Sequence, residues 1–185
     1  MSGSRLIHHA FFVIFFLSCG HSTQVSRQKT DAIAGANKNP ARFTSANVSE
    51  RCEALKIHIQ KASDLFNVEI PLIAGIIKIE SNFNIAAKSS QGAMGLMQVM
   101  AKTAKMFECG DLYDPYENIM CGTKVLKRFL EFYDGNIILA LSGYHAGHFF
   151  ADTAKETGRL PENFDYVEKV LSMRAKFIDS GCLFK

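Results

Sequence analysis

Residues 73–100, IAGIIKIESNFNIAAKSSQGAMGLMQVM, decide the fold that we expect, because an apolar helical segment leads directly into a loop rich in serine and glycine. Pro71 suits the first turn of a helix that continues to about Ser81. The stretch holds a single acidic residue, Glu80, and no other follows until Glu108. The sequence therefore sets one carboxylate into an otherwise apolar helix.

Helical spacing places this carboxylate on the apolar face. Offsets of three, four and seven residues put Glu80 on one face with Ile73, Ile76 and Ile77. Apolar surroundings disfavour the charged form of a carboxylate, so we expect the pKa of Glu80 to be raised, as a general acid requires. The alternative is that Glu80 turns outward to water at the helix end or pairs with a distant Lys or Arg.

The loop over residues 87–95 (AKSSQGAMG) has a composition suited to ligand binding. Gly92 and Gly95 allow the backbone to approach a ligand closely. Hydrogen-bonding and apolar side chains are mixed around them: Ser89, Ser90, Gln98, Met94, Met97 and Met100. Polar groups set in apolar contact surface are what a sugar-binding cleft needs. The alternative is an ordinary helix connector whose methionines belong to the core.

The rest of the chain also has a helical period, and strand-like alternation is hard to find. Apolar residues recur every three or four positions at Leu55, Ile59, Ala62 and Phe66. Further helices are expected over residues 96–107, 118–133, 137–146 and 165–178. The fold class that we predict is all-α, with one small helical domain over residues 49–185.

Length and composition agree with one globular domain. The chain has 185 residues, of which 48% are hydrophobic and 21% charged. The formal net charge of +3 is too small to indicate a nucleic-acid partner. Residues 21–48 are polar and without periodicity, so we interpret them as a linker.

The N-terminus has the layout of a secretory signal. Arg5 precedes the apolar run AFFVIFFL, and the small residues Ser18, Cys19 and Gly20 follow it. A membrane-spanning helix is the weaker alternative, because it needs roughly 20 apolar residues. Cleavage after Gly20 would remove residues 1–20 and release the protein into the periplasm. Cleavage before Cys19 would give a lipid-modified cysteine and an outer-membrane lipoprotein.

The cysteines give an independent indication of export. Either cleavage takes Cys19 out of the thiol pool and leaves four cysteines, an even number suited to an oxidising compartment. Their spacing favours a local disulfide between Cys109 and Cys121, and a second one between Cys52 and Cys182 that ties the two ends of the domain. The alternative is four buried free thiols; the spacing does not resemble a zinc site.

The segment ESNFNIAAKSSQGAMGLMQVMAKTA resembles the signature of the lysozyme-like lytic transglycosylases of the soluble-transglycosylase (SLT) type. Similarity to this family continues with Tyr144 and Ala146-Gly147, and then with Pro161-Glu162 and Tyr166-Val167. The resemblance covers nearly all of residues 49–185. It implies a lysozyme-like helical domain that cleaves the MurNAc–GlcNAc bond of peptidoglycan without a cofactor or metal.

The resemblance also implies roles for single residues. Glu80 would be the catalytic acid and then the base, and Tyr144 would lie near its carboxyl group and orient it. Ser81 would support the end of the catalytic helix. The residues expected to line or buttress the cleft are Ser89, Gln98, Met100, Tyr144, Glu162 and Tyr166.

Two departures from the family pattern stand near this site. His145 replaces the usual Asn, and Ala101 replaces the usual Pro. The change at His145 predicts altered substrate contacts or an altered pH response. His145 and His148 are three residues apart, but two histidines without further ligands are weak evidence for a metal, so we interpret them as local polar residues.

The absence of a second carboxylate close to Glu80 in the sequence suits a transglycosylase. The C6 hydroxyl of the sugar would attack the anomeric carbon and close a 1,6-anhydro ring, in place of water and a second carboxylate. Three alternatives stay open. Glu162 or Asp165 could fold back toward Glu80 and supply the second carboxylate. The protein could be a goose-lysozyme-like hydrolase, or a non-catalytic peptidoglycan-binding factor of secretion assembly. Small members of the family often accompany secretion or conjugation machinery, which would be a further partner beside the glycan strands.

Overall fold

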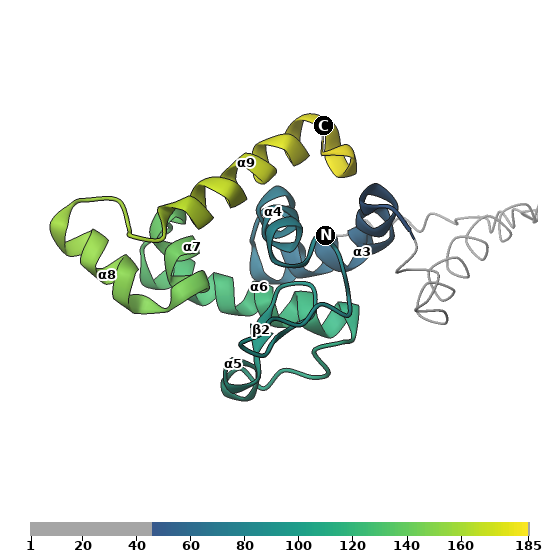
Figure 1. Ribbon diagram of the computed structural model, residues 1–185, viewed down its shortest axis with the longest axis horizontal. Helices are drawn as coiled ribbons and strands as arrows, with labels where there is room; N and C mark the ends of the chain where they lie inside the picture. Colours follow the sequence, from purple (N-terminus) through teal and green to yellow (C-terminus); the bar gives the residue numbers. More distant parts are fainter. Residues whose placement is uncertain (1–45, 185) are drawn as a thin grey trace, which may run out of the picture.

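The structure is a computed structural model of the chain, and it describes residues 46–184. The predicted signal over residues 1–20 and nearly all of the predicted linker lie outside this range. Within it the fold is almost entirely helical, as predicted (Figure 1). The helices are α3 (Val48–Phe66), α4 (Ile70–Ser81), α5 (Ala101–Met106), α6 (Pro115–Phe132), α7 (Ile137–Ala146), α8 (His148–Thr157), α9 (Phe164–Ser180) and the 3₁₀ helix η1 (Gly181–Leu183).

Helix α4 forms the centre of the core. Its isoleucines Ile73, Ile76 and Ile77 have no exposed surface. α4 packs against α3 and α9, and α6 packs against α3 and α7. A Cβ atom on Gly75 would lie 3.0 Å from the backbone nitrogen of Arg174, so glycine permits the close crossing of α4 and α9. Figure 1 shows α9 running across α4 toward the C-terminus.

The predicted helix over residues 96–107 is wrong in its first half. Two short antiparallel strands, β1 (Ala93–Met94) and β2 (Val99–Met100), form a hairpin there, and α5 begins only at Ala101. Gln98 adopts a left-handed backbone with φ of 48°, which ends any helical path. The backbone N–H of Met97 donates to the side chain of Asn118 instead of to a helical carbonyl.

Helix α8 was not predicted. Its buried residues are only Ala151 and Ala154, because the helix lies at the side of the molecule and covers α7 with small side chains. Small alanines produce a weak apolar period, so this helix leaves little signal in the pattern. The other helices agree with their predicted ranges to within a few residues at each end.

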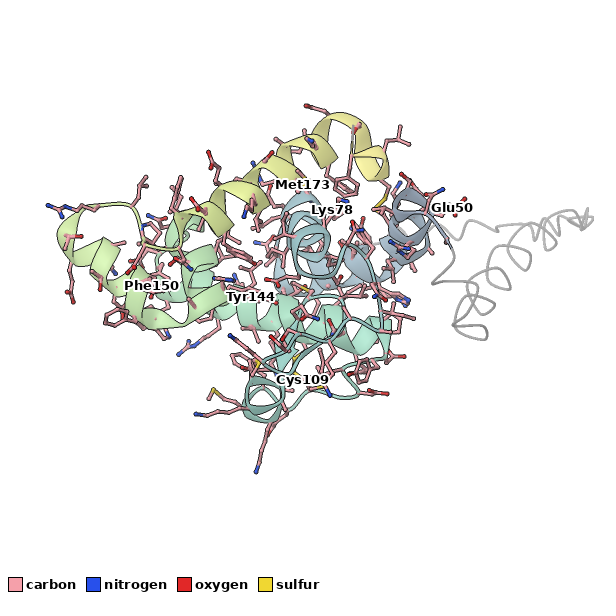
Figure 2. All side chains as sticks on the ribbon, viewed as in Figure 1. Glu50, Lys78, Cys109, Tyr144, Phe150 and Met173 are labelled. Carbon is pink, nitrogen blue, oxygen red and sulfur yellow. A yellow bond between two sulfur atoms is a disulfide. The ribbon has the colours of Figure 1, made fainter. Side chains whose placement is uncertain are left out.

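Both predicted disulfides are confirmed. Cys52 in α3 is bonded to Cys182 in η1, and Cys109 is bonded to Cys121 in α6; the Cα atoms of each pair lie 5.6 Å apart. Figure 2 shows Cys109 beside α5, and Tyr144 on α7 above this region. Among the helices that the structure describes, none has the length and apolar character needed to cross a membrane.

Candidate active site

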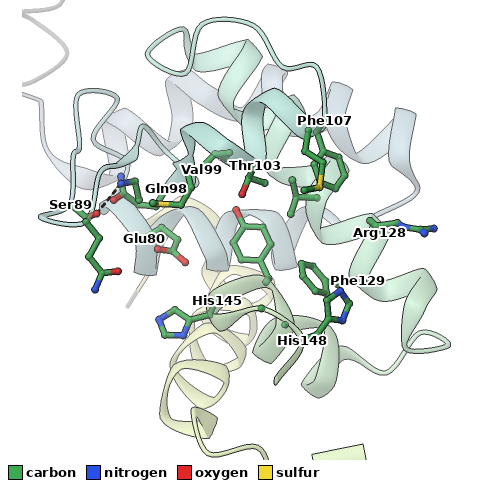
Figure 3. A pocket seen from close by; sticks show the side chains of 18 of the residues that line it. Glu80, Ser89, Gln98, Val99, Thr103, Phe107, Arg128, Phe129, His145 and His148 are labelled. Carbon is green, nitrogen blue, oxygen red and sulfur yellow. Dashed lines mark hydrogen bonds between the residues drawn. The ribbon is translucent and has the colours of Figure 1, made fainter. Parts of the chain in front are cut away.

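A cavity of about 690 Å³ opens beside the C-terminal end of α4. Its walls come from the β1–β2 hairpin, α5, α6 and the corner between α7 and α8 (Figure 3). The structure brings six of the predicted site residues into this wall: Glu80, Ser89, Gln98, Met100, Tyr144 and His145. The family signature and the later YHAG segment therefore meet across one cleft.

Glu80 sits in the last turn of α4, at the point where the apolar face reaches the cavity. Burial raises the pKa of Glu80, and a hydrogen bond from Tyr166 partly opposes this shift. The hydroxyl of Tyr166 donates to Glu80 Oε1 at 2.6 Å. The other oxygen, Oε2, accepts no hydrogen bond from the described residues. The carboxyl group is therefore held at one oxygen and open at the other.

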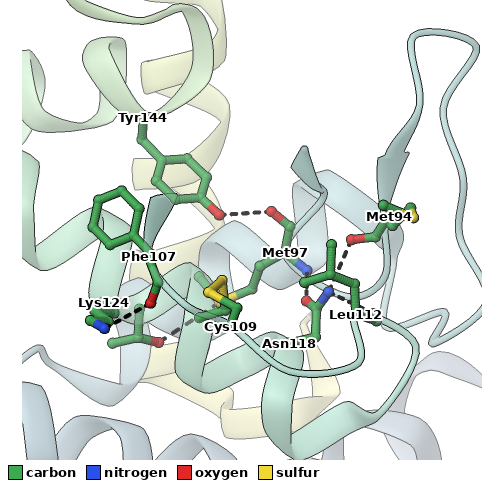
Figure 4. Close-up of a disulfide and its surroundings, with 10 residues drawn as sticks. Met94, Met97, Phe107, Cys109, Leu112, Asn118, Lys124 and Tyr144 are labelled. Carbon is green, nitrogen blue, oxygen red and sulfur yellow. Dashed lines mark hydrogen bonds between the residues drawn. A yellow bond between two sulfur atoms is a disulfide. The ribbon is translucent and has the colours of Figure 1, made fainter. Parts of the chain in front are cut away.

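Tyr166, rather than Tyr144, holds the carboxyl group of Glu80. The hydroxyl of Tyr144 donates to the carbonyl oxygen of Met97 at 2.7 Å, which ties α7 to the hairpin (Figure 4). Tyr144 still lines the cavity together with Glu80. Burial, and then the negative charge of Glu80, raise the pKa of Tyr144. The expected orienting contact thus comes from α9, and Tyr144 positions the opposite wall.

The polar side chains of the loop hold the loop itself. Ser89 Oγ accepts from the backbone N–H of Ala93 at 3.0 Å. The amide nitrogen of Gln98 donates to the carbonyls of Gly95 and Ala87, at 2.9 Å and 3.2 Å. The Ser89 hydroxyl proton and the Gln98 side-chain oxygen then remain available to a ligand.

The two loop glycines have different roles. Gly92 has φ of 89°, and a Cβ atom there would meet nothing within 4 Å. Gly95 has φ of 74°, and a Cβ atom there would collide with the amide of Asn118 and the carbonyl of Leu112. Gly95 is therefore required for packing inside the protein, and not for close approach of a ligand as predicted.

Asn118 is a structural residue of the site that the sequence reasoning missed. Its side chain is buried and makes three hydrogen bonds: it accepts from the Met97 N–H at 2.8 Å and donates to the carbonyls of Met94 and Leu112, at 2.9 Å and 2.8 Å. These contacts fix the hairpin on α6 (Figure 4). The sequence held one signal for this role: Asn118 is a polar residue on the same helix face as Gly122 and Val125, which indicates a buried polar contact.

Besides the two loop glycines, three predicted residues lie outside the cavity wall. Tyr166 is buried behind Glu80, and Ser81 Oγ donates to the carbonyl of Ile77 at 3.1 Å, which supports the helix end. Glu162 is exposed and the structure does not bring it into the wall. Its neighbour Asn163 makes the contacts there instead, to Ser142 and to His145.

His145 packs against the tyrosine that holds the acid. The rings of His145 and Tyr166 stack with their centroids 4.1 Å apart, and the amide nitrogen of Asn163 lies 3.3 Å from His145 Nδ1. Asn163 Nδ2 also donates to the Ser142 carbonyl, so the nitrogen that faces His145 is a donor and Nδ1 must accept. Burial lowers the pKa of His145, in agreement with a neutral ring.

The far part of the cavity wall was not predicted as part of the site, although His148 was noted as a local polar residue. It comes from α5, α6 and the start of α8, and it combines aromatic rings with one cation (Figure 3). Its residues are Thr103, Met106, Phe107, Val125, Arg128, Phe129, Phe132 and His148.

Comparison with solved structures gives the same fold. The crystal structure of the 70 kDa soluble lytic transglycosylase from Escherichia coli matches with a TM-score of 0.51 and 26% identity, over 64% of this chain and 21% of that one. The inactive-mutant structure of lytic transglycosylase Slt from Pseudomonas aeruginosa matches with a TM-score of 0.52 and 25% identity, over the same shares.

Sequence comparison points the same way. The transglycosylase of Enterobacteria phage PRD1 is 39% identical over 103 residues, which are 56% of this chain and 38% of the relative. The soluble lytic murein transglycosylase of Escherichia coli K12 is 39% identical over 82 residues, which are 39% of this chain and 13% of the relative. This chain thus spans well under half the length of these relatives. A family model described as "Transglycosylase SLT domain" matches residues 57–164, more than half of the chain, and the chain therefore belongs to the transglycosylase SLT domain family.

Proposed function

We propose that the protein is a peptidoglycan lytic transglycosylase that cleaves the β-1,4 bond between MurNAc and GlcNAc and leaves a 1,6-anhydro-MurNAc end. One observation carries the proposal. Among residues 46–184, Glu80 is the single carboxylate in the cavity wall, and burial raises its pKa. A hydrolase of the usual kind needs two carboxylates beside the bond, whereas a transglycosylase needs one.

The first step uses Glu80 as an acid. A raised pKa keeps the carboxyl group protonated closer to neutral pH. Tyr166 occupies Oε1, so the proton that moves is held at Oε2, the oxygen without a partner in the described part of the chain. Transfer of this proton to the bridging oxygen releases the GlcNAc side as an alcohol and leaves an electron-deficient anomeric carbon on MurNAc.

The second step uses the same group as a base. The C6 hydroxyl of MurNAc forms a bond to its own anomeric carbon, and its proton passes to the Glu80 carboxylate. Glu80 returns to its starting state and no water is consumed. The hydrogen bond from Tyr166 stabilises the carboxylate between the two steps. Ring closure within one sugar needs no second nucleophile, because the reacting atoms are already close.

Product analysis separates this reaction from its alternatives. Purified sacculi are digested and the fragments are analysed by mass spectrometry: anhydro ends are one water lighter than reducing ends. Anhydro ends are the expected result, and reducing ends would indicate a hydrolase. Glu80→Gln is expected to abolish turnover while its melting transition stays cooperative. Binding of sacculi without turnover by the unaltered protein would show a non-catalytic factor.

We also propose that the protein acts in the periplasm, where its substrate lies. Support comes from the predicted signal and from relatives named membrane-bound lytic murein transglycosylases. Fractionation of cells that produce the unaltered chain or Cys19→Ser tests the anchor: loss of the protein from the outer membrane in the variant would indicate a lipid on Cys19. A role beside secretion or conjugation machinery stays a prediction.

A further inference from the structure

The far end of the cavity has the features of a second recognition site. Phe107 and Phe129 face one another across it, and Arg128 stands at its outer edge (Figure 3). Phe132 is 49% exposed and Met106 is 70% exposed, so this wall presents apolar surface to solvent. Arg128 is exposed and forms no ion pair with any residue in the range 46–184. The end therefore offers apolar contact and one unpaired cation.

The wall at this end is held in place by polar contacts. Lys124 Nζ donates to the carbonyl oxygen of Phe107 at 2.8 Å, which fixes Phe107 over α6 (Figure 4). His148 packs against Phe129 and Phe132, with ring centroids 4.9 Å and 4.6 Å apart. The site is therefore built from side chains of α6 and α8 and from Phe107 at the end of α5, which contact one another.

A partly buried hydrogen-bond chain sets the tautomer of His148. The hydroxyl of Tyr133, which is 2% exposed, donates its one proton to Asp152 Oδ1 at 2.8 Å. The same hydroxyl lies 3.0 Å from His148 Nδ1, so Nδ1 must carry a proton and donate to it. In the neutral ring Nε2 is then an acceptor, and no described residue donates to it. The catalytic steps at Glu80 do not use this chain.

We propose that the far end of the cavity binds the peptide stem of the peptidoglycan strand, with Arg128 contacting a stem carboxylate and His148 Nε2 accepting from a stem amide N–H. This inference rests on the proposed function, because it takes the strand at Glu80 as given. Peptide stems carry carboxylates, amide N–H groups and methyl groups, which match the cation, the acceptor and the phenylalanines. In the peptide-bearing strand the lactyl carboxyl group of MurNAc forms the amide bond to the stem, so the sugars carry no charge that would complement Arg128.

The test measures binding without turnover. Glu80→Gln protein is titrated with soluble glycan strands that carry their peptides and with the same strands stripped by an amidase, in which the lactyl carboxylates that the amidase exposes are then capped as methylamides. We expect tighter binding of the peptide-bearing strands by about threefold to tenfold. Arg128→Gln in the same background is expected to bring the affinity ratio close to one. Salt at about 0.5 M should lower the ratio in the parent but not in Arg128→Gln, because salt screens the ion pair.

Two further variants separate recognition from general damage. Lys127→Gln is the matched control, because Lys127 is adjacent on α6, lies outside this cavity and pairs with Glu131 at 3.6 Å; its ratio should stay at the parental value. Tyr133→Phe frees His148 Nδ1 and should lower the ratio about twofold. Equal binding of the two strand types by the parent, or a parental ratio in Arg128→Gln, would overturn the proposal. If the Glu80→Gln parent binds neither strand type, that result would instead count against the proposed function.

Discussion

The two ends of the cavity are built in different ways. At the acid end, Glu80 and Tyr144 each take part in one short hydrogen bond, 2.6 Å and 2.7 Å long, that crosses between distant helices or loops. At the far end, Arg128 reaches into solvent and Phe132 is half-exposed. The difference teaches that the chemistry depends on a buried group with a shifted pKa, whereas recognition of a charged, hydrated stem needs a surface that the stem can reach.

The largest expected effect comes from shortening the acid. Glu80→Asp moves the carboxyl group away from the glycosidic bond of the substrate and from Tyr166, so we expect kcat on sacculi to fall on the order of 100-fold. Arg128→Lys is the matched change at the far end, since it keeps the charge, and should alter kcat/KM only about threefold. Steady-state release of soluble fragments measures both. Equal losses in the two variants would show that the ends do not differ in their tolerance.

The next effect is on stability and concerns the scaffold under the acid end. Asn118→Ala removes three hydrogen bonds, two of them buried, and leaves their partners in the hairpin and at Leu112 unsatisfied, so the free energy of unfolding should fall by about 3 kcal/mol. Asn136→Ala is the control, because Asn136 is an exposed N-cap that accepts from the Leu139 N–H, and should lose about 1 kcal/mol. Urea unfolding followed by circular dichroism compares them. A loss at Asn118 no larger than at Asn136 would contradict the scaffold role.

A smaller effect is expected in the pH dependence of the acid end. The hydroxyl of Tyr166 stabilises the ionised form of Glu80 and so lowers its pKa against the effect of burial. Tyr166→Phe should therefore raise the pKa of Glu80 further and move the alkaline decline of kcat to higher pH. The maximum rate should fall about threefold, because the carboxyl group loses its orienting contact. A decline that moves to lower pH would refute this assignment.

The smallest effect concerns His145. Burial lowers its pKa, so the folded protein disfavours the charged ring while the unfolded chain does not. Its stability contribution is therefore complete above the ordinary pKa of histidine and is lost as pH falls toward the lowered value. His145→Asn should remove this loss, and the difference in Tm between pH 8 and pH 5 should shrink by about one to two degrees. Calorimetry measures Tm of both proteins at the two pH values. The same Tm difference in both proteins would show that the ring does not titrate in this range.

Local patterns predicted much of the fold. The isoleucine spacing predicted α4 and placed Glu80 on its buried face, and the range 137–146 coincides with α7. The four cysteines gave both disulfides, because one pair is close in sequence and the other lies at the two ends of the domain. These features depend on spacing within single helices or on simple counting.

Apart from the disulfide between Cys52 and Cys182, the individual contacts between distant segments were not predicted, and the resemblance that placed Tyr166 at the cleft gave the orienting role to Tyr144. The bond from Tyr166 to Glu80 joins residues 86 positions apart and exists because α9 crosses α4. The hairpin at residues 93–100 replaces the first part of the predicted helix over residues 96–107, because the Met97 N–H donates to Asn118 of α6. Arg128 lies outside the family signature, and no pattern in its own helix shows that this position faces the cavity.

The bond between Cys52 and Cys182 has a mechanical consequence. It joins residues separated by 130 positions in the chain, and all the elements that form the cavity lie between them. Tension applied to the chain outside this pair passes through the two sulfur atoms and does not load the elements between them, although the first turn of α3, before Cys52, lies outside the bond. An enzyme pulled between a moving polymer and its own attachment would keep the shape of its cleft under that load. In the reduced protein, unfolding under the same load would begin at α3 and α9 and proceed inward.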